Sequence, residues 1–463
     1  MTKAMTALVL LAAACRAQAP AQSIEGTWQG TLEAGAVKLR LALHISKDAS
    51  GAFTSKLDSI DQGAMGIPVA KTTFADHALH LDMPVLHASF EGTLHANGEI
   101  AGTFTQGAAL PLTLKRAEKE EALIRPQNPK PPFPYDAIDV SYENKSGGVT
   151  LAGTLTVPHG AAPFPAAILI TGSGPQDRDE SLMGHKPFWV IADYLTRRGI
   201  AILRLDDRGV GKSIGNSSQA TLADMAGDVI AGVEFLKGRH EIDAKHIGLI
   251  GHSEGGIVGP LAASTSSDVA FVVMLAGTGV PGDQVLELQA ELVARAAGAS
   301  DAAIAANHRI QTKLLDTLRA ERDEKDEKVI IEKLRAAWRQ GKPAGAGENA
   351  DKVVDTQIAA LVSPEIRSFL FFDPAPVLRS LQVPVLALNG SRDIQVPPRQ
   401  NLPAIAGALA AGGNSDFTVA ELPGLNHLFQ KCKACSVSEY GQIEETFSPA
   451  ALEIMGNWIT RHK

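Results

Sequence analysis

The most constraining feature of this chain is a five-residue turn at 251–255, which reads Gly-His-Ser-Glu-Gly. It directly follows the short apolar run 246–250, so it reads as G-x-S-x-G at the end of a predicted strand. Such a turn lifts a serine hydroxyl clear of the sheet, and glycine on both flanks permits backbone angles that a side chain would obstruct. An apolar helical pattern follows the turn. We therefore expect Ser253 to be a nucleophile.

Two later strands end in residues that could complete a catalytic triad. Asp393 follows the apolar run 383–388, and His427 follows the run 417–422. The chain order Ser, Asp, His is that of α/β-hydrolases, and open α/β sheets build their sites beyond the carboxyl ends of their strands. We predict that His427 takes the proton of Ser253 and that Asp393 fixes the imidazole tautomer. Asp393 could instead be an ordinary turn residue, with another acid in its place.

An acyl-transfer site also needs backbone N–H groups aimed at the developing oxyanion. One is expected from Glu254, directly after the nucleophile. The other is expected from the loop after the apolar strand 166–170, which reads Thr-Gly-Ser-Gly-Pro over 171–175. Ser173 is the predicted second donor, because the glycines beside it allow close backbone approach to a ligand. The alternative is that this segment is a plain glycine turn.

Two motifs suggest other chemistry and fail on inspection. The segment 206–213 ends like a phosphate-binding loop, but it has Asp206 where that pattern needs glycine. We expect Asp207 and Arg208 to hold loops together by hydrogen bonds instead. Cys432 and Cys435 are only two of the four ligands that structural zinc requires. The sequence thus predicts no metal and no cofactor.

Composition and the N-terminus bear on partners and location. The chain has 463 residues, a net charge of −8 and no basic run, which argues against nucleic acid as a partner. Lys3 precedes the apolar run 4–14 and then small residues, the pattern of a signal peptide over 1–21. We expect an exported protein, periplasmic or secreted. The segment 11–15 also resembles a lipoprotein box with its leucine one position too far from Cys15, so lipid anchoring there is the lesser alternative.

An oxidising compartment favours a disulfide between Cys432 and Cys435, which are separated only by Lys433 and Ala434. Two free buried thiols are the alternative. A redox role is less favoured, since thioredoxin-like motifs open a helix in a βαβ unit.

Periodicity divides the rest of the chain into three parts. Residues 22–116 alternate apolar and polar, with a hairpin signal at Asn97-Gly98, and predict a small antiparallel β domain, a barrel or a sandwich. Residues 117–136 are proline-rich and predict a semi-rigid linker. Residues 137–463 alternate helices with apolar strands, which is typical of a mostly parallel sheet covered on both faces.

Within this α/β region the strand pattern stops over about 282–372, where Ala, Lys and Glu dominate with helical periodicity. An insertion at this point would lie over the C-terminal edge of the sheet. We expect a helical cap over the active site; a decorative insertion is the alternative. No stretch after the signal segment is long and apolar enough to span a membrane.

Four motifs resemble those of a known family: GSGPQDRD at 172–179, DDRGVGKS at 206–213, GHSEGG at 251–256 and LNHLFQ at 425–430. The chain resembles bacterial exported α/β-hydrolases of the serine aminopeptidase-like and prolyl-oligopeptidase-like group of hydrolases and esterases. The resemblance covers roughly residue 126 to the C-terminus. It implies Ser253, Asp393 and His427 as the triad, in agreement with the motif reading, but its members cleave esters, thioesters or peptides.

Three functions follow as hypotheses. The first is a carboxylesterase acting on small or medium acyl esters. The second is a serine aminopeptidase on short peptides, with Glu254 and acids of the cap holding the substrate amine. The third is a non-catalytic binding protein, which the complete set of triad residues argues against. No pattern in the sequence sets the oligomeric state or the role of the β domain.

Overall fold

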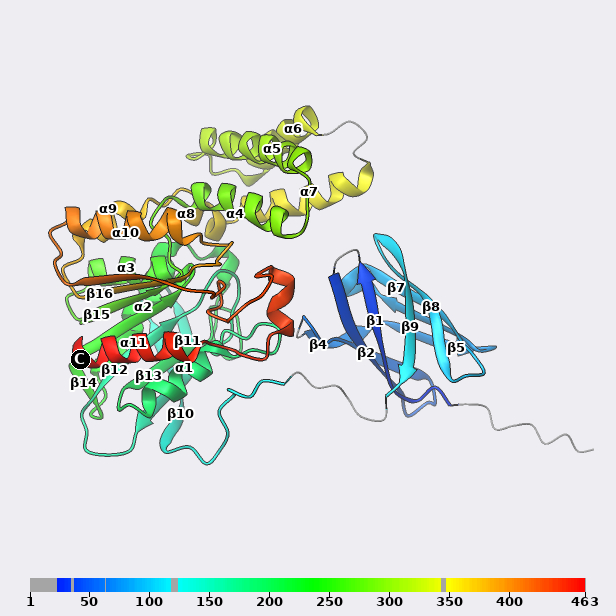
Figure 1. Cartoon of the computed structure of the whole chain (residues 1–463), viewed down its shortest axis with the longest axis horizontal. Coiled ribbons are helices and arrows are strands. Elements are labelled where there is room, and N and C mark those ends of the chain that lie inside the picture. The colour runs from blue at the N-terminus through cyan, green and yellow to red at the C-terminus, as the bar shows by residue number, and fades with distance from the viewer. Residues whose placement is uncertain (1–22, 35–36, 63, 118–123, 343–346, 463) are drawn as a thin grey trace, which may run out of the picture. The chain divides into compact units, whose positions relative to one another are not determined.

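The computed structural model describes residues 23–34, 37–62, 64–117, 124–342 and 347–462, and these form two units (Figure 1). The predicted signal peptide and Cys15 lie outside the described residues. One unit contains most of the chain before residue 118, and the other contains the chain after residue 123.

The first unit is a nine-stranded β-sheet, so the predicted all-β domain is confirmed. Its order is β4-β3-β2-β1-β9-β8-β7-β6-β5. Its strands are β1 (Gly26–Ala34), β2 (Val37–Lys47), β3 (Phe53–Ser59), β4 (Ala64–Val69), β5 (Lys71–Ala75), β6 (Ala78–Met83), β7 (Ala88–Leu94), β8 (Glu99–Gln106) and β9 (Ala108–Arg116), with a short 3-10 turn η1 (Pro84–Leu86).

The predicted hairpin joins β7 to β8, with Leu94 opposite Ile100 and Gly98 at a φ of +82°. Only Ala70 separates β4 from β5, the two ends of the strand order. The sheet must therefore curl until its two edges approach, which is the barrel-like form of the two predicted shapes. Its interior is lined by Trp28, Phe90 and other buried apolar side chains.

The second unit is built on an eight-stranded mixed sheet in the order β10-β11-β13-β12-β14-β15-β16-β17. The strands are β10 (Tyr135–Asn144), β11 (Val149–Pro158), β12 (Phe164–Ile170), β13 (Ala201–Leu205), β14 (Ile242–His252), β15 (Phe271–Leu275), β16 (Val385–Gly390) and β17 (Phe417–Leu422). β11 is antiparallel to both of its neighbours, β10 and β13. The remaining six strands, β13-β12-β14-β15-β16-β17, pair in parallel. The carboxyl ends of β12, β14, β16 and β17 therefore share one edge.

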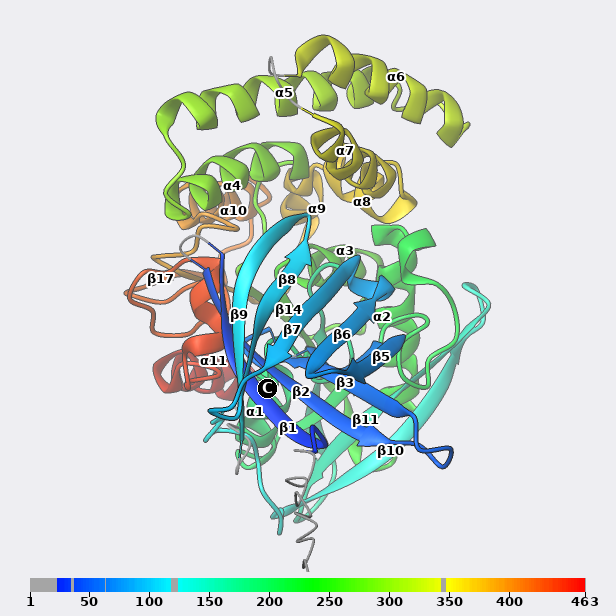
Figure 2. The same ribbon diagram turned by 90° about the vertical axis from the view of Figure 1, so that its right-hand side faces the viewer.

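Helices cover both faces of this sheet because its strands are apolar on both sides, as the sequence predicted (Figures 1 and 2). In β12, Ile168 packs toward one layer and Leu169 toward the other. The first layer is α2 (Leu222–Lys237), α3 (Gly255–Thr265), α9 (Pro374–Ser380) and α10 (Pro398–Ala411). The second is α1 (Pro187–Thr196) and α11 (Pro449–His462). Two short 3-10 turns are η2 (Ser217–Gln219) and η3 (Val437–Gln442).

The start of α2 shows how the sequence sets a helix end. Thr221 accepts a hydrogen bond from the N–H of Asp224, and the Asp224 carboxylate accepts one from the N–H of Thr221. This capping box satisfies two backbone donors that the first turn leaves without helical partners. The predicted helix start is confirmed.

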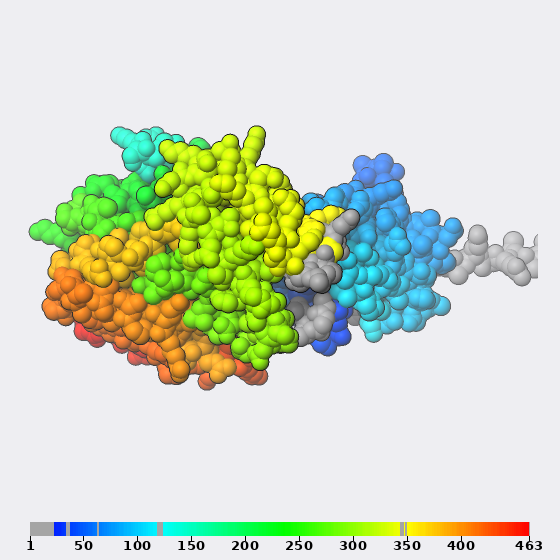
Figure 3. Space-filling view, turned by 90° about the horizontal axis from the view of Figure 1, so that it is seen from above, coloured from blue at the N-terminus to red at the C-terminus, as the bar shows by residue number. Residues whose placement is uncertain are grey.

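The insertion between β15 and β16 is helical, as predicted, and forms a cap over the carboxyl edge of the sheet (Figure 1). In the view from above, its green and yellow atoms face the viewer (Figure 3). It comprises α4 (Gly282–Ala296), α5 (Asp301–Ala320), α6 (Glu327–Gly341), α7 (Glu348–Leu361) and α8 (Pro364–Leu370). The cap has its own apolar core around Leu318, Leu334 and Ile358. Two bonds from α8 tie it down: Glu365 Oε1 accepts from the N–H of Gly174, and Ser368 Oγ accepts from the N–H of Leu222.

Among the described residues, no helix combines the length and the apolar character needed to cross a lipid bilayer.

Candidate active site

Ser253 stands on the sharp turn between β14 and α3. Its φ is +52°, a left-handed conformation that non-glycine residues rarely adopt. The flanking glycines have no room for a side chain: a Cβ on Gly251 would lie 1.9 Å from the carbonyl oxygen of Gly255, and one on Gly255 would lie 2.2 Å from that of Ile170. The Ser253 N–H donates to the carbonyl of Leu275 at 2.8 Å, which ties the turn to β15. The strained conformation is thus fixed by tight backbone packing.

The structure brings Ser253, His427 and Asp393 together at the shared carboxyl edge. His427 Nε2 lies 3.1 Å from Ser253 Oγ, and His427 Nδ1 lies 2.8 Å from Asp393 Oδ2. The other carboxylate oxygen, Oδ1, accepts the N–H groups of Gln395 and Val396 at 2.8 and 2.9 Å. With Asp393 only 4% exposed, its carboxylate holds a proton on Nδ1 and leaves Nε2 able to accept the serine proton.

A side-chain bracket shapes the loop that carries His427. Asn426 Oδ1 accepts the N–H groups of Leu428 and Gln430 at 3.0 and 2.9 Å, and Asn426 Nδ2 donates to Gln430 Oε1 at 2.9 Å. Both side chains are fully buried. The backbone on the C-terminal side of the histidine is therefore held by buried hydrogen bonds.

A disulfide joins Cys432 to Cys435, five residues after His427. The N–H of Cys432 donates to the carbonyl of Gly424 at 3.2 Å, and the N–H of Cys435 donates to Glu439 Oε2 at 2.6 Å. The pairing that the sequence favoured is present, and it closes the end of the histidine loop.

The two predicted oxyanion donors lie on either side of the nucleophile. Ser173 and Glu254 both line the cavity that contains Ser253 Oγ. Within the described part of the chain, neither backbone N–H is donated to another protein group. The loop runs close to the nucleophile at Gly172, where a Cβ would lie 3.3 Å from Glu180 Oε1 and 3.4 Å from the Cβ of Ser253. Both N–H groups are thus available to a substrate oxygen.

A buried pair behind the triad, Glu180 and His252, was missed by sequence reasoning. His252 Nδ1 lies 2.9 Å from Glu180 Oε1, and His252 Nε2 donates to the carbonyl of His427 at 3.1 Å. Burial lowers the pKa of His252, but the Glu180 carboxylate and the His427 carbonyl outweigh it and leave the pKa above its usual value. Glu180 Oε1 also accepts the N–H of Gly172 at 2.8 Å. The Glu180 carboxylate thus binds the loop after β12 (residues 171–175, the oxyanion loop) directly. It also contacts the loop that carries His427 (residues 423–431, the histidine loop) through His252.

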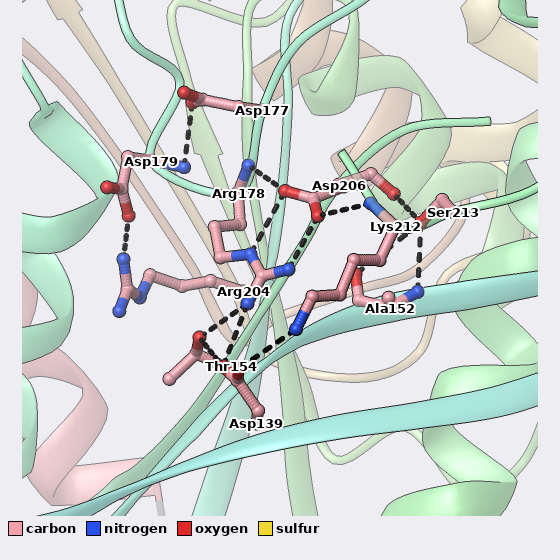
Figure 4. A network of polar contacts seen from close by, with 10 residues as sticks. All are labelled: Asp139, Ala152, Thr154, Asp177, Arg178, Asp179, Arg204, Asp206, Lys212 and Ser213. Carbon is pink, nitrogen blue, oxygen red and sulfur yellow. Dashed lines mark hydrogen bonds and ion pairs between the residues drawn. The ribbon is translucent and has the colours of Figure 1, made fainter. Parts of the chain in front are cut away.

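Figure 4 shows the polar contacts of residues 177–179, which directly precede Glu180 in the chain. Arg178 binds Asp206 through Nε at 3.0 Å and Nη2 at 2.6 Å, and its N–H donates to the same carboxylate at 2.9 Å. Arg204, almost fully buried, pairs with Asp179. These paired charges hold residues 178 and 179 against the end of β13, and Arg178 also donates to Thr154 in the middle of β11 at 2.8 Å. Asp206, which in the sequence only breaks the phosphate-loop pattern, accepts all three of these hydrogen bonds from Arg178.

The loop-holding role predicted for Asp207 and Arg208 is confirmed. Asp207 accepts the hydroxyl of Thr171 and the N–H of Gln176, each at 2.8 Å. Arg208 Nε donates to Asp228 at 2.6 Å. The first contact ties the segment after β13 to the oxyanion loop after β12.

Three carboxyl groups interact electrostatically beside the nucleophile. Burial, with Glu365 and Asp207 nearby, raises the pKa of Glu254 to about 8. Burial raises the pKa of Asp207 to about 7, with a smaller contribution from Glu180 and Glu365, and it also raises the pKa of Glu365. Glu254 is only 4% exposed. Because burial raises its pKa to about 8, its carboxyl is mostly neutral at pH 7.

Ser253 opens into a cavity of about 280 Å³ roofed by the cap. α4 contributes Val285 and Leu286, and α8 contributes Ile366 and Phe369. The hydroxyl of Thr278, just past β15, is buried against this cavity and has no hydrogen-bond partner in the described residues. Among those residues, no cluster of three or more His, Cys, Asp or Glu side chains is arranged to hold a metal ion.

The sheet is mostly parallel and is covered by helices on both faces. It carries a serine on the β14–α3 turn, and an acid and a histidine beyond later strands. This arrangement defines an α/β-hydrolase. Residues 188–345 match the family described as serine aminopeptidase, S33. The chain is also 27% identical over 348 residues, 74% of each protein, to esterase EstD from Thermotoga maritima. The protein is therefore a serine hydrolase with the α/β-hydrolase fold, and it is similar to the serine aminopeptidase and esterase proteins of that fold.

Solved structures with a similar chain path include two α/β-hydrolases. GrgF from Penicillium sp. sh18 is 18% identical with a TM-score of 0.44, and the match covers 71% of this chain and 99% of that one. Esterase Pf2001 from Pyrococcus furiosus is 14% identical with a TM-score of 0.41, and the match covers 71% and 93%.

Proposed function

We propose that this protein hydrolyses carboxylic esters of small molecules through an acyl-enzyme on Ser253. The observation that carries the proposal is the hydrogen-bonded line from Ser253 Oγ through the His427 imidazole to Asp393, at 3.1 and 2.8 Å. The serine hydroxyl contacts the base that would take its proton, and the imidazole contacts the carboxylate that would stabilise its charge. Ser253 also faces a cavity that can hold a substrate. The relative named esterase EstD supports the same reaction class.

In the acylation half, Ser253 Oγ attacks the ester carbonyl carbon while its proton passes to His427 Nε2. The carbonyl oxygen becomes negative and is bound by the N–H groups of Ser173 and Glu254. Asp393 stabilises the imidazolium that forms. The carbon–oxygen bond to the alcohol then breaks, the alcohol leaves with the proton held by His427, and the acyl group remains on Ser253.

In the deacylation half, water takes the place of the alcohol. His427 removes a proton from the water, which attacks the acyl carbon to form a second negative oxygen in the same donor pair. The bond to Ser253 Oγ breaks, the serine regains the proton from His427, and the carboxylic acid is released. Two half-reactions thus share one base and one oxyanion site.

A serine aminopeptidase is the second candidate, favoured by the family description and by two carboxyls near the nucleophile, Glu254 and Glu365. An aminopeptidase needs ionised carboxylates to hold the substrate ammonium. With a pKa raised to about 8, Glu254 is mostly neutral at pH 7. A neutral acid offers no ion pair, so an aminopeptidase role would require the bound ammonium itself to lower the pKa of Glu254.

A parallel screen of nitrophenyl esters and aminoacyl nitroanilides tests the choice. We expect Ser253-dependent turnover of esters that exceeds turnover of any anilide by at least about a hundredfold. A Ser253-dependent preference for anilides with a free amine, lost in Glu254→Gln, would replace the esterase by the aminopeptidase. A fluorophosphonate probe that labels the wild type and spares Ser253→Ala controls for an intact nucleophile in both arms.

We also propose that the protein is exported, with cleavage of the signal segment. Support comes from the sequence of residues 1–21 and from the Cys432–Cys435 disulfide, since structural disulfides persist in oxidising compartments. Fractionation of cells that express the full chain, with mass analysis of the mature N-terminus, tests the proposal. Full-length protein in the cytoplasmic fraction would contradict it, and a lipid-bearing N-terminus at Cys15 would replace simple cleavage by anchoring.

A further inference from the structure

We infer that an apolar groove within the cap receives the aliphatic acyl chain of a medium- or long-chain ester whose carbonyl is attacked by Ser253. This inference rests on the proposed esterase function and adds the substrate class. It assigns to the cap a binding site distinct from the small cavity around the triad.

The groove has a volume of about 940 Å³ and is formed by cap helices alone. Its walls come from α4 through α8, with Ala306, Ile310, Trp338, Val353 and Leu361 among them. In the described residues that line it, no side chain is charged. Of its polar members, Gln311 already donates its amide to the carbonyl of Leu286 at 2.9 Å. Such a lining suits a hydrocarbon chain and offers nothing to pair with a charged group.

The groove meets the active-site cavity at two side chains. Leu286 on α4 and Ile366 on α8 line both spaces. The cavity around Ser253, at about 280 Å³, is at the small end for a ligand site, whereas the groove is much larger. Leu286 and Ile366 therefore form the boundary between the two spaces, and a chain too long for the first must pass between these two side chains to enter the apolar second space.

The position of Ile366 points to the acyl chain and not the alcohol. Its neighbour Glu365 accepts a hydrogen bond from the N–H of Gly174 at 3.1 Å, next to the oxyanion donor Ser173. The shared wall is therefore on the oxyanion-loop side of the nucleophile. The alcohol must depart toward His427, which protonates it, so the acyl substituent is the part that extends along this wall.

Ala306→Trp tests the groove, because an indole at this lining position of α5 would project into it and obstruct part of its length. Ala305→Trp is the matched control: Ala305 is the adjacent residue of the same helix, exposed and outside the lining. Circular dichroism and melting curves check that both variants fold. The readout is kcat/KM for nitrophenyl esters from acetyl to dodecanoyl, together with labelling rates of Ser253 by short- and long-alkyl fluorophosphonates.

For the wild type we expect kcat/KM to rise with acyl length beyond butyryl, by up to about fourfold per methylene that is fully buried. Ala306→Trp should cut kcat/KM for decanoyl esters by about tenfold or more and leave acetyl esters within about twofold. Ala305→Trp should change neither. Labelling by the long-alkyl phosphonate should fall in parallel with decanoyl turnover, while labelling by the short-alkyl phosphonate stays constant.

Three results would overturn the inference. The first is Ser253-dependent acetyl turnover with no dependence on acyl length in the wild type, which would leave the esterase function standing. The second is an equal effect of Ala306→Trp on short and long chains. The third is a chain-length effect for acetate esters of long alcohols but not for long acyl esters of methanol, which would assign the groove to the alcohol. Absence of ester turnover would overturn the proposed function, while the phosphonate series would still decide whether the groove binds a chain.

Discussion

The Glu180 carboxylate lies 2.9 Å from Nδ1 of His252, and both residues are almost fully buried. Through this pair, the backbone carbonyl of His427 and the N–H of Gly172 are linked by a continuous set of hydrogen bonds. The histidine loop and the oxyanion loop come from distant parts of the chain, so this pair fixes their relative position.

Glu180→Gln should lower kcat by about ten- to a hundredfold with little change in KM, because a shift of about 1 Å in a reacting group is enough for such a loss. His252→Gln should have a similar effect, and the double variant should lose little more than either single variant. Steady-state kinetics on protein shown to be folded at the assay temperature measures this. A lower melting temperature with unchanged kcat would mean that the pair is structural only.

Ser253→Ala should abolish turnover while preserving the fold, because loss of a triad serine typically costs on the order of a million-fold in kcat. The hydroxyl faces the cavity, and its removal leaves the packing of Gly251 and Gly255 unchanged. Single-turnover assays and a fluorophosphonate label measure the loss. Retention of more than a few per cent of activity would place the nucleophile elsewhere.

Asp393→Asn should lower kcat by roughly ten-thousand-fold, because an amide in place of the carboxylate favours the wrong imidazole tautomer. The bonds from Gln395 and Val396 to the Oδ1 oxygen can remain, so the fold should persist. Asp416→Asn, which removes the charge of an exposed carboxylate beside His462, serves as control and should leave kcat unchanged. Near-normal activity of Asp393→Asn would show that another acid serves His427.

Glu254→Gln should change the alkaline limb of the pH profile. The pKa of Glu254 is raised to about 8, so its carboxyl gains a negative charge as the pH rises through that value. That charge opposes the oxyanion bound at the neighbouring N–H group, and kcat of the wild type should therefore fall above about pH 8. The glutamine variant should lack this fall, whereas the exposed Glu453→Gln control should keep it. Profiles of kcat between pH 6 and 9.5 measure the difference.

The raised pKa of Glu254 also makes the free energy of unfolding decrease as the pH rises. Since the pKa rises from an ordinary 4.5 to about 8 on folding, the folded chain holds a proton that the unfolded chain releases between these values. This contribution is fully present below about pH 4.5 and is lost as the pH rises through 8. The melting temperature of Glu254→Gln should fall less over that window than that of the wild type, and parallel curves would refute the assignment.

Removal of the disulfide in the double variant Cys432→Ser/Cys435→Ser should lower stability only modestly, because a ring this small removes little entropy from the unfolded chain. Activity should fall by several-fold at most, since Asn426 and Gln430 hold the loop independently. Thiol alkylation before and after reduction, followed by mass analysis, checks the bond. Two free thiols in exported protein before reduction would contradict it.

Sequence reasoning located the residues of the active site that belong to local motifs. Ser253 has its turn glycines, and Asp393 and His427 each follow an apolar strand, so chain order alone predicted that they would meet. Glu180 and Glu365 carry no such local signal. Their roles depend on contacts with Gly172 and Gly174 that only the folded chain creates.

Strand positions were also predictable, but strand ends and long-range order were not. The apolar run 246–250 predicted the middle of β14, while the observed strand begins at Ile242, where it pairs with Phe164 before a change of register. Alternation predicted the β domain, yet its strand order is set by pairings between distant segments. Such pairings follow from side-chain fit across the sheet, which periodicity does not encode.

The attachment of α8 has a consequence for how such enzymes diversify. The cap enters and leaves the sheet between β15 and β16 as one uninterrupted stretch, so a genetic exchange at its two ends would move it as a cassette. Any replacement must still supply an acceptor for the N–H of Gly174 and one for the N–H of Leu222, as Glu365 and Ser368 do. Chimaeras that keep these two docking points while varying the remaining cap helices would give a library in which substrate range changes over a constant catalytic base.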